Sequence, residues 1–229
     1  MAGPKRGSRG SGKRLAAMVF LAPLFVFVAA LGTRMGWWSY ETGHDQMVMR
    51  FGVILATMAV LAALALLVAA FRRRAPLWLA GAAVVISALT FGGLAWEMTR
   101  ISSGPPDDIS TDLTEIPAFG PLEDVRGDAG PAEIGGVDTC PGAVPVMRQA
   151  PPATAAWALQ QAGFSVRGSV TVSRAVGSQR GFWFGTTHDA VIRIRPGRTD
   201  IRVAARDGRP HGGEACRLTT RLSELLRGE

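Results

Sequence analysis

Three polar residues in the last fifth of the chain, His188, Asp189 and His211, have side chains suited to acid–base chemistry. A histidine paired with an aspartate can act as a general base, and two histidines with a carboxylate can bind a metal ion. Neighbouring residues of a strand point to opposite faces, so His188 and Asp189 form a pair only in a turn, and the Gly-Thr-Thr stretch before them resembles one. We expect a surface or structural role for all three, no metal ion and no cofactor, with catalysis as the alternative.

A set of arginines lies close to these residues in the sequence. Because arginine is always charged and binds carboxylates through a planar fork, the set is a candidate site for an anion, a lipid headgroup or a partner protein. The alternative is internal pairing with Asp200, Asp207, Glu214 or the acidic residues of 101–140. The four arginines are Arg202, Arg206, Arg209 and Arg217.

The elements that must position these residues begin with three apolar stretches in the first hundred residues. Each is 17 to 21 residues long, and about 20 apolar residues of helix cross a hydrocarbon layer of about 30 Å. Backbone polar groups in lipid must bond within their own segment, so we expect three helices that form a membrane anchor over residues 15–100. The stretches are Leu15–Leu31, Phe51–Phe71 and Leu77–Trp96, and the expected spans are about 15–36, 51–71 and 77–97.

The excess positive charge belongs to this anchor. Residues 1–100 contain 11 Lys and Arg and three acids, whereas residues 101–229 contain 14 Arg and 15 acids. The basic residues cluster in segment 1–14 and in the turn at 72–74, and Lys and Arg are retained on the cytoplasmic side. We therefore expect a bacterial inner-membrane protein with a cytoplasmic N-terminus, an outward loop over 33–50 and a periplasmic C-terminal part. Nucleic acid is not an expected partner, because the basic residues lie beside lipid.

The first apolar stretch also resembles a signal peptide, since a basic start precedes it. We favour a retained helix, because 17 apolar residues exceed a usual signal core and an aromatic stretch at 37–40 follows. None of the three stretches contains an acidic or basic residue, which argues against a transporter or a proton relay. Small residues such as Gly81, Gly92 and Gly93 let helices approach closely, which is typical of an assembly surface.

The outward part begins with an acidic segment, residues 101–150, which is rich in Gly and Pro and has no sustained periodicity. Residues 101–140 contain nine acids and one arginine, and residues 141–229 contain 13 arginines and six acids. These opposite charges favour an extended segment that wraps over the domain after it. A mobile tether is the alternative.

Regular patterns return in residues 151–229. Apolar and polar residues alternate with the two-residue period of strands, and Pro196-Gly197-Arg198 is typical of a hairpin turn. Strands with helices on one face predict an α+β domain with a small antiparallel sheet. The expected elements are a helix at 153–162, strands at 164–174, 181–185, 190–195 and 199–205, and an amphipathic helix at 215–226. The buried stripes are expected to contain Ala153, Ala156, Trp157 and Leu159 in the first helix and Leu218, Leu222, Leu225 and Leu226 in the second.

The only cysteines, Cys140 and Cys216, both lie in the outward part. An oxidising compartment allows them to pair, and a bridge that closes 76 residues would contribute roughly 4 kcal/mol. Two independent thiols, or one catalytic cysteine, are the alternatives.

Three stretches, Pro105–Phe119, Trp183–Ile194 and Asp200–Leu226, resemble the bacterial domain-of-unknown-function family 1499. The resemblance covers about 105–227, and the three apolar stretches are similar to the longer, membrane-anchored form of that family. The family has no established activity, so the resemblance implies the fold and not an enzyme. Asp189, Arg202, Arg206 and Arg217 match its polar pattern, whereas His188, Val203, Ala205, His211 and Ala215 depart from it. Cys216 stands where the family commonly has a small residue, which favours a matched pair with Cys140.

Together these patterns predict a three-helix membrane protein that presents an interaction domain to the periplasm. The expected function is non-catalytic docking to a membrane or envelope protein complex, or stabilisation of one. The alternative is a periplasmic hydrolase, or a domain that binds a small ligand or lipid headgroup through His188, Asp189, His211 and the arginines. An enzyme is the less favoured of the two.

Overall fold

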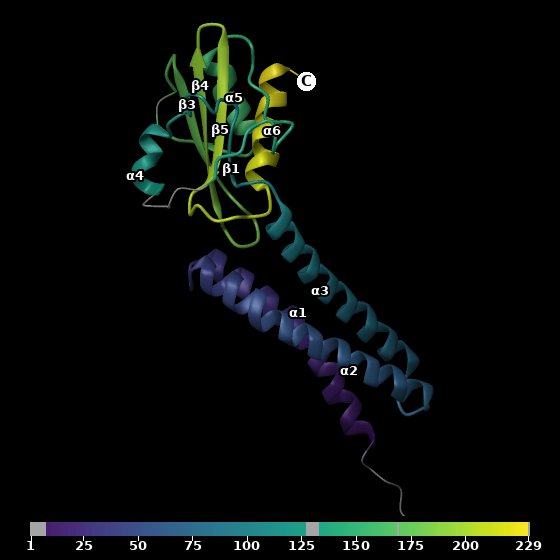
Figure 1. The fold of residues 1–229 in the computed structure, drawn as a ribbon. Coiled ribbons are helices and arrows are strands. Elements are labelled where there is room, and N and C mark those ends of the chain that lie inside the picture. Colours follow the sequence, from purple (N-terminus) through teal and green to yellow (C-terminus); the bar gives the residue numbers. More distant parts are fainter. Residues whose placement is uncertain (1–7, 127–132, 169, 229) are drawn as a thin grey trace, which may run out of the picture. The chain divides into compact units, whose positions relative to one another are not determined.

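The computed structural model describes residues 8–126, 133–168 and 170–228 (Figure 1). The basic residues Lys5 and Arg6 lie outside this part of the chain. The chain forms two units that divide between Met98 and Thr99.

Within the described residues the structure confirms the prediction of three helices long and apolar enough to cross a membrane, and the last turn of the third belongs to the second unit. A π-helical segment precedes the second helix and continues into it without a break. The elements are α1 (Ser8–Met35), η1 (Glu41–Gly52), α2 (Val53–Phe71) and α3 (Leu77–Ser103). The candidate spans within them are Arg14–Met35, Glu41–Phe71 and Leu77–Ser103.

The prediction of a loop over residues 33–50 is wrong for most of that range, because α1 continues to Met35 and η1 begins at Glu41. Gly36, at a φ of +77°, ends α1, and the helical backbone resumes at Glu41. The polar residues that suggested a loop are compatible with helix, because the backbone bonds of a helix do not depend on apolar side chains. His44, for example, stacks on Tyr40 at a centroid distance of 4.7 Å and shares a 2.8 Å hydrogen bond with Asp45.

Buried alanines lie where the helices of the first unit meet, whereas Gly81, Gly92 and Gly93 of α3 are not packed against a neighbouring helix. Ala59 and Ala63 of α2 are buried, and Ser87 of α3 donates a 3.1 Å hydrogen bond to the carbonyl oxygen of Ala59. A Cβ on Gly32 would lie 2.1 Å from the Trp38 ring, so α1 needs glycine where this indole packs.

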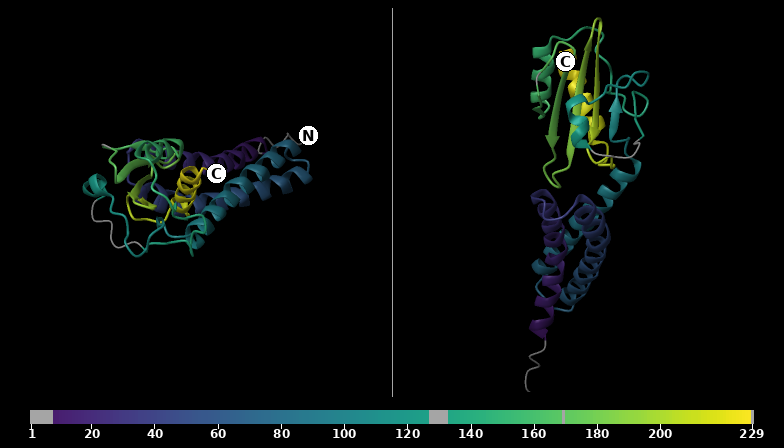
Figure 2. Two further views of the ribbon diagram at one scale, coloured as in Figure 1. Left: turned by 90° about the horizontal axis from the view of Figure 1, so that it is seen from above. Right: turned by 90° about the vertical axis from the view of Figure 1, so that its left-hand side faces the viewer.

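The second unit confirms the α+β prediction. Its sheet has the strand order β1-β5-β4-β3-β2, and every neighbouring pair is antiparallel. Figure 2 shows the ribbon from two further sides. Arg195 pairs with Arg198 across the predicted turn, so β4 and β5 form the expected hairpin. The strands are β1 (Asp108–Ser110), β2 (Ser165–Val166), β3 (Arg174–Arg180), β4 (Thr187–Arg195) and β5 (Arg198–Ala205).

Both faces of the sheet are covered. Ile192 and Ile201 point toward the main core, which the helices α5 (Pro152–Gln161) and α6 (Glu214–Arg227) complete. On the other face, Val176, Val191 and Ala204 pack against Phe119 and Leu122. Leu122 belongs to the short helix η2 (Gly120–Leu122), which α4 (Glu123–Arg126) follows.

The acidic segment wraps over the domain, so the wrapping alternative is confirmed. Its residues 108–110 form β1 and pair with β5 in register, with Ile109 opposite Val203. Further along, Val146 forms a two-way backbone bridge with Thr199.

Three local predictions are wrong. The strand expected at 164–174 is interrupted: the range contains the two residues of β2 and the first residue of β3, and Gly168 between them has a φ of +67° that an extended strand does not adopt. The strand expected at 181–185 is instead the turn between β3 and β4, closed by a 2.7 Å bond from the Gly181 N–H to the Thr186 oxygen. Trp157 is exposed, and the buried stripe of α5 consists of Ala155, Ala158 and Leu159, whose small side chains let the helix approach the sheet.

Candidate functional site

His188 and Asp189 lie in β4 and not in the turn before it, so their side chains point to opposite faces of the sheet. His188 points toward the core under α6, and Asp189 toward the face that carries Phe119 and Leu122. Both side chains are almost completely buried. The structure therefore separates the predicted pair and gives each residue a different set of neighbours.

A first polar cluster, the histidine cluster, consists of His188, His211, Asp107 and Asp207. The two imidazole rings meet edge to face at a centroid distance of 5.4 Å. His188 Nε2 lies 3.8 Å from Asp107 Oδ1, and the His211 Nε2 to Asp207 Oδ1 distance is 2.9 Å. Within the described part of the chain, this cluster and all others lack the geometry of a metal site.

Asp107 is the centre of this cluster, and sequence reasoning missed it. Its carboxylate accepts backbone N–H bonds from His211, from Gly213 at 3.3 Å and from Ala215 at 2.9 Å, at the N-terminus of α6. Burial alone would raise the pKa of Asp107, but attraction to His188 and the N–H bonds of Ala215 and His211 outweigh it, and the pKa is lowered. No local pattern in the sequence connects Asp107 to α6, because 108 residues separate it from Ala215.

We expect Asp107→Asn to lower the free energy of unfolding by about 1 to 2 kcal/mol, because the amide replaces a charged cap of α6. The contribution of the native carboxylate is complete above its ordinary pKa of 3.8 and is lost as the pH falls through the lower folded value. Denaturant unfolding of the detergent-solubilised chain between pH 3 and pH 7 measures both effects. The exposed Asp138→Asn is the matched control, and an equal loss in the two variants would contradict this role.

On the opposite face, Asp189 accepts bonds from three side chains. Arg206 binds it through a fork at 2.7 and 3.0 Å, Arg126 at 3.1 Å and the Ser178 hydroxyl at 2.7 Å. The pKa of the Arg206 guanidinium is raised, and its hydrogen bonds to Asp189 are the main cause. The buried carboxylate thus has two cationic partners from distant parts of the chain.

Arg202 has a similar internal partner. Its guanidinium forms a fork with the Asp108 carboxylate at 2.7 and 2.9 Å and donates to the Pro117 oxygen at 3.1 Å. Arg202 and Arg126 both lie over the Phe119 ring, at 4.6 and 4.1 Å from its centroid. These contacts fasten the acidic segment to β5.

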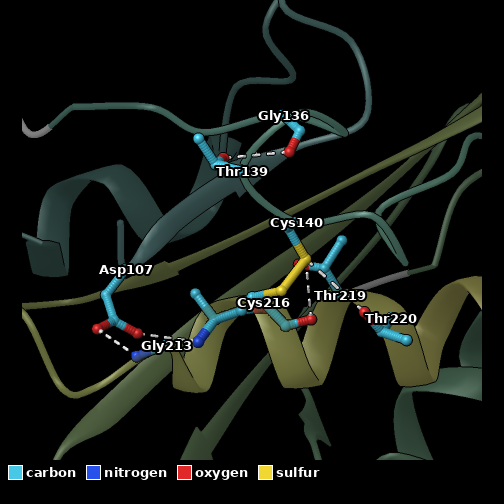
Figure 3. The surroundings of a disulfide bond; sticks show 9 residues. Asp107, Gly136, Thr139, Cys140, Gly213, Cys216, Thr219 and Thr220 are labelled. Atoms are coloured by element: carbon cyan, nitrogen blue, oxygen red, sulfur yellow. Dashed lines mark hydrogen bonds between the residues drawn. A yellow bond between two sulfur atoms is a disulfide. The ribbon is translucent and has the colours of Figure 1, made fainter. Parts of the chain in front are cut away.

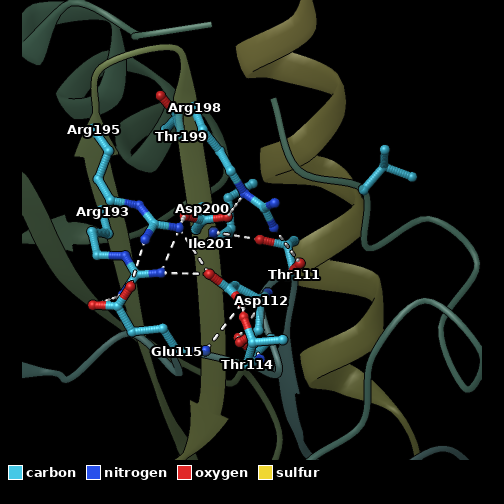
Figure 4. A network of polar contacts seen from close by, with 12 residues as sticks. Thr111, Asp112, Thr114, Glu115, Arg193, Arg195, Arg198, Thr199, Asp200 and Ile201 are labelled. Carbon is cyan, nitrogen blue, oxygen red and sulfur yellow. Dashed lines mark hydrogen bonds and ion pairs between the residues drawn. The ribbon is translucent and has the colours of Figure 1, made fainter. Parts of the chain in front are cut away.

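A third group of ion pairs joins the same segment to the β4–β5 hairpin (Figure 4). Asp200 accepts bonds from Arg193 at 3.2 Å, Arg195 at 2.6 Å and Arg198 at 2.6 Å. Asp112 of the acidic segment accepts from Arg193 and Arg195 at 2.9 and 2.8 Å. The pKa of Asp112 is strongly lowered, chiefly by hydrogen bonding to Thr114.

The other two predicted arginines lie elsewhere. Arg217 is on α6, pairs with Glu214 and borders an open depression of about 410 Å³ between α5 and α6. Arg209 lies in the segment between β5 and α6, where its backbone N–H donates to Asp207. The four arginines therefore do not converge, and each of Arg202, Arg206 and Arg217 faces a carboxylate of its own chain.

The two cysteines form a disulfide (Figure 3). The bond joins Cys140 of the acidic segment to Cys216 in the first turn of α6, across 76 residues. It lies close to Asp107, whose carboxylate caps the same helix (Figure 3). Covalent, ionic and strand contacts thus hold the acidic segment on the domain.

Comparisons with models of known protein families, with curated proteins and with solved structures find no match to this chain.

Proposed function

We propose that this chain is an integral protein of a bacterial inner membrane, with its N-terminus in the cytoplasm and its second unit in the periplasm. The basic residues before α1 and in the 72–74 turn support this orientation, because Lys and Arg are retained on the cytoplasmic side. The disulfide supports it as well, since such bonds persist in oxidising compartments. Membership of family 1499 is part of the same proposal and rests on the sequence resemblance.

The proposed role is non-catalytic docking to a membrane or envelope protein complex, or stabilisation of one. The observation that carries this proposal is the internal pairing of the polar side chains. Asp189, Asp200 and Asp108 each bind arginines of the same unit, and His188 and Asp189 lie on opposite faces. Breaking a buried ion pair leaves an uncompensated charge and is costly, so groups that are already paired with one another favour a structural role over binding of a substrate.

The docking surface proposed within the membrane is the face of α3 that contains Gly81 and Gly92. The two glycines are 11 residues apart, which places them on one side of the helix, and a Cβ on either would meet no atom within 4 Å. Ser87 and Leu94 are buried on the opposite side of the same helix. A partner helix can approach closely along such a face.

Gly92→Leu is expected to disrupt the complex, because the larger side chain prevents close helix approach. The measurement is the size of the gently solubilised complex on native gels, with a tag at the carboxyl end. Phe91→Leu, on a different side of α3, is the control and should preserve the complex. A parent chain that migrates as a monomer, or a Gly92→Leu complex of unchanged size, would count against docking on this face.

One observation favours a second candidate, a hydrolase or ligand-binding function. Among the described residues His188 Nε2 is a buried ring nitrogen with no hydrogen-bond partner, and it faces His211 and Asp107. A small ligand with a hydrogen-bonding group would satisfy it. Under this candidate the purified parent chain hydrolyses ester or phosphoester substrates, and His188→Gln abolishes this activity. Equal activity of the parent chain and His188→Gln would refute it.

A further inference from the structure

The turn between β3 and β4 has three consecutive aromatic residues at its tip. Phe182 and Trp183 are 70% and 62% exposed and contact each other edge to face at 5.2 Å, and Phe184 is half-buried. Gly181 and Gly185 flank them, and Gly185 has a φ of +67°. Aromatic surface displayed in this way contributes little to the domain's own core, and contiguous apolar surface commonly marks an interaction site.

This tip lies at the end of the sheet where the chain enters the domain. The Ala205 N–H, at the end of β5, donates to the Asp107 oxygen at 2.8 Å, and the Arg206 N–H donates to the Thr187 oxygen at 2.8 Å. Thr187 pairs in turn with Arg180, the last residue before the aromatic turn. Three strand spacings of about 4.8 Å therefore separate Asp107 from the base of the turn, a sideways distance of about 15 Å.

The last turn of α3 lies at the same end. An Arg100 guanidinium N–H donates to the His211 oxygen at 3.4 Å, and Gly104 lies against Gly212, so residues 99–107 fold as part of the second unit. At 27 residues α3 is about 40 Å long, whereas the hydrocarbon layer is about 30 Å thick. Its end therefore emerges at headgroup level, and only four residues connect Ser103 to β1, a reach of at most about 14 Å.

We propose that the Phe182-Trp183-Phe184 tip inserts into the interface of the lipid bilayer that α3 spans. Tryptophan and phenylalanine are suited to this position, because their rings partition between acyl chains and headgroups. The occupant is the lipid itself, because the chain's own connection holds this end of the domain at the bilayer surface. Insertion would give the domain a second point of attachment beside α3. This proposal depends on the membrane-spanning helices and not on docking or on the side of the membrane that the domain faces.

The test is quenching of tryptophan emission in proteoliposomes of phosphatidylcholine with brominated acyl chains. The difference between the emission of the full chain and that of Trp183→Phe is the emission of Trp183 in its native surroundings. We expect brominated lipid to remove most of this difference emission, relative to unbrominated phosphatidylcholine. Trp157→Phe is the matched control: Trp157 is also exposed, lies on α5, and its difference emission should be retained.

Quenching of Trp183 no stronger than that of Trp157 would overturn the proposal. A Trp183 emission that is blue-shifted and yet unquenched would also overturn it, because that result means packing against protein. Unchanged far-UV circular dichroism of Trp183→Phe verifies that the difference emission reports on a folded chain.

Discussion

Replacement of both cysteines by serine is expected to lower the free energy of unfolding of the second unit by roughly 4 kcal/mol. The bond between Cys140 and Cys216 closes 76 residues, and a long closed loop restricts the unfolded chain most strongly. The loss is a large part of the 5 to 15 kcal/mol that is typical of a domain. Pulse proteolysis of the detergent-solubilised chain across a urea series measures the change in unfolding midpoint.

Reducing agent is the matched treatment for this prediction. It should move the midpoint of the parent chain to that of the double-serine variant and leave the variant unchanged. A parent chain whose midpoint is the same with and without reductant would show that the two sulfur atoms are not bonded in the protein.

The second large effect is expected for Asp189→Asn, which should cost about 3 to 5 kcal/mol. Asp189 is fully buried, and its carboxylate balances Arg206 and the largely buried Arg126. Removal of the negative charge leaves both guanidinium groups without their counter-ion in a partly dry site, and the cost of an uncompensated charge there is high. The same pulse-proteolysis midpoint measures it.

Glu115→Gln is the control for Asp189→Asn, because Glu115 also pairs with arginines but its side chain is 69% exposed. Ion pairs that are exposed to water contribute little to the free energy of unfolding, so Glu115→Gln should unfold at nearly the same urea midpoint as the parent chain. Similar midpoints for the two variants would contradict the importance of the buried pair.

Long and strongly periodic elements were predictable from the sequence. The three membrane helices follow from apolar stretches of about 20 residues. The β4–β5 hairpin follows from the two-residue period of strands, and the leucine stripe of α6 from the 3.6-residue period of a helix. Predictions failed where a segment has the composition that is typical of a different type of element. Phe182-Trp183-Phe184 has the composition of a strand, yet the glycines around it close a turn, and the polar residues of η1 suggested a loop although they lie in a helix.

The candidate site was less predictable, because its contacts connect distant parts of the chain. The opposite charges of the acidic segment and the domain predicted their association. The ion pairs Asp108–Arg202 and Asp112–Arg195 are two of the contacts that hold them together. No pattern in the sequence indicates which carboxylate faces which arginine. Asp107 was missed for the same reason, since it caps a helix whose Ala215 is 108 residues away.

The orientation of the chain in the membrane is the central claim, and the accessibility of single cysteines tests it most directly. Val172→Cys, in the second unit, and Arg74→Cys, in the turn between α2 and α3, are reacted in intact bacterial cells with a maleimide that cannot cross the inner membrane. The native cysteines are bonded to each other and do not react. We expect Val172→Cys to be labelled in intact cells and Arg74→Cys only after the inner membrane is opened. Labelling of Arg74→Cys in intact cells, with Val172→Cys protected, would contradict this account.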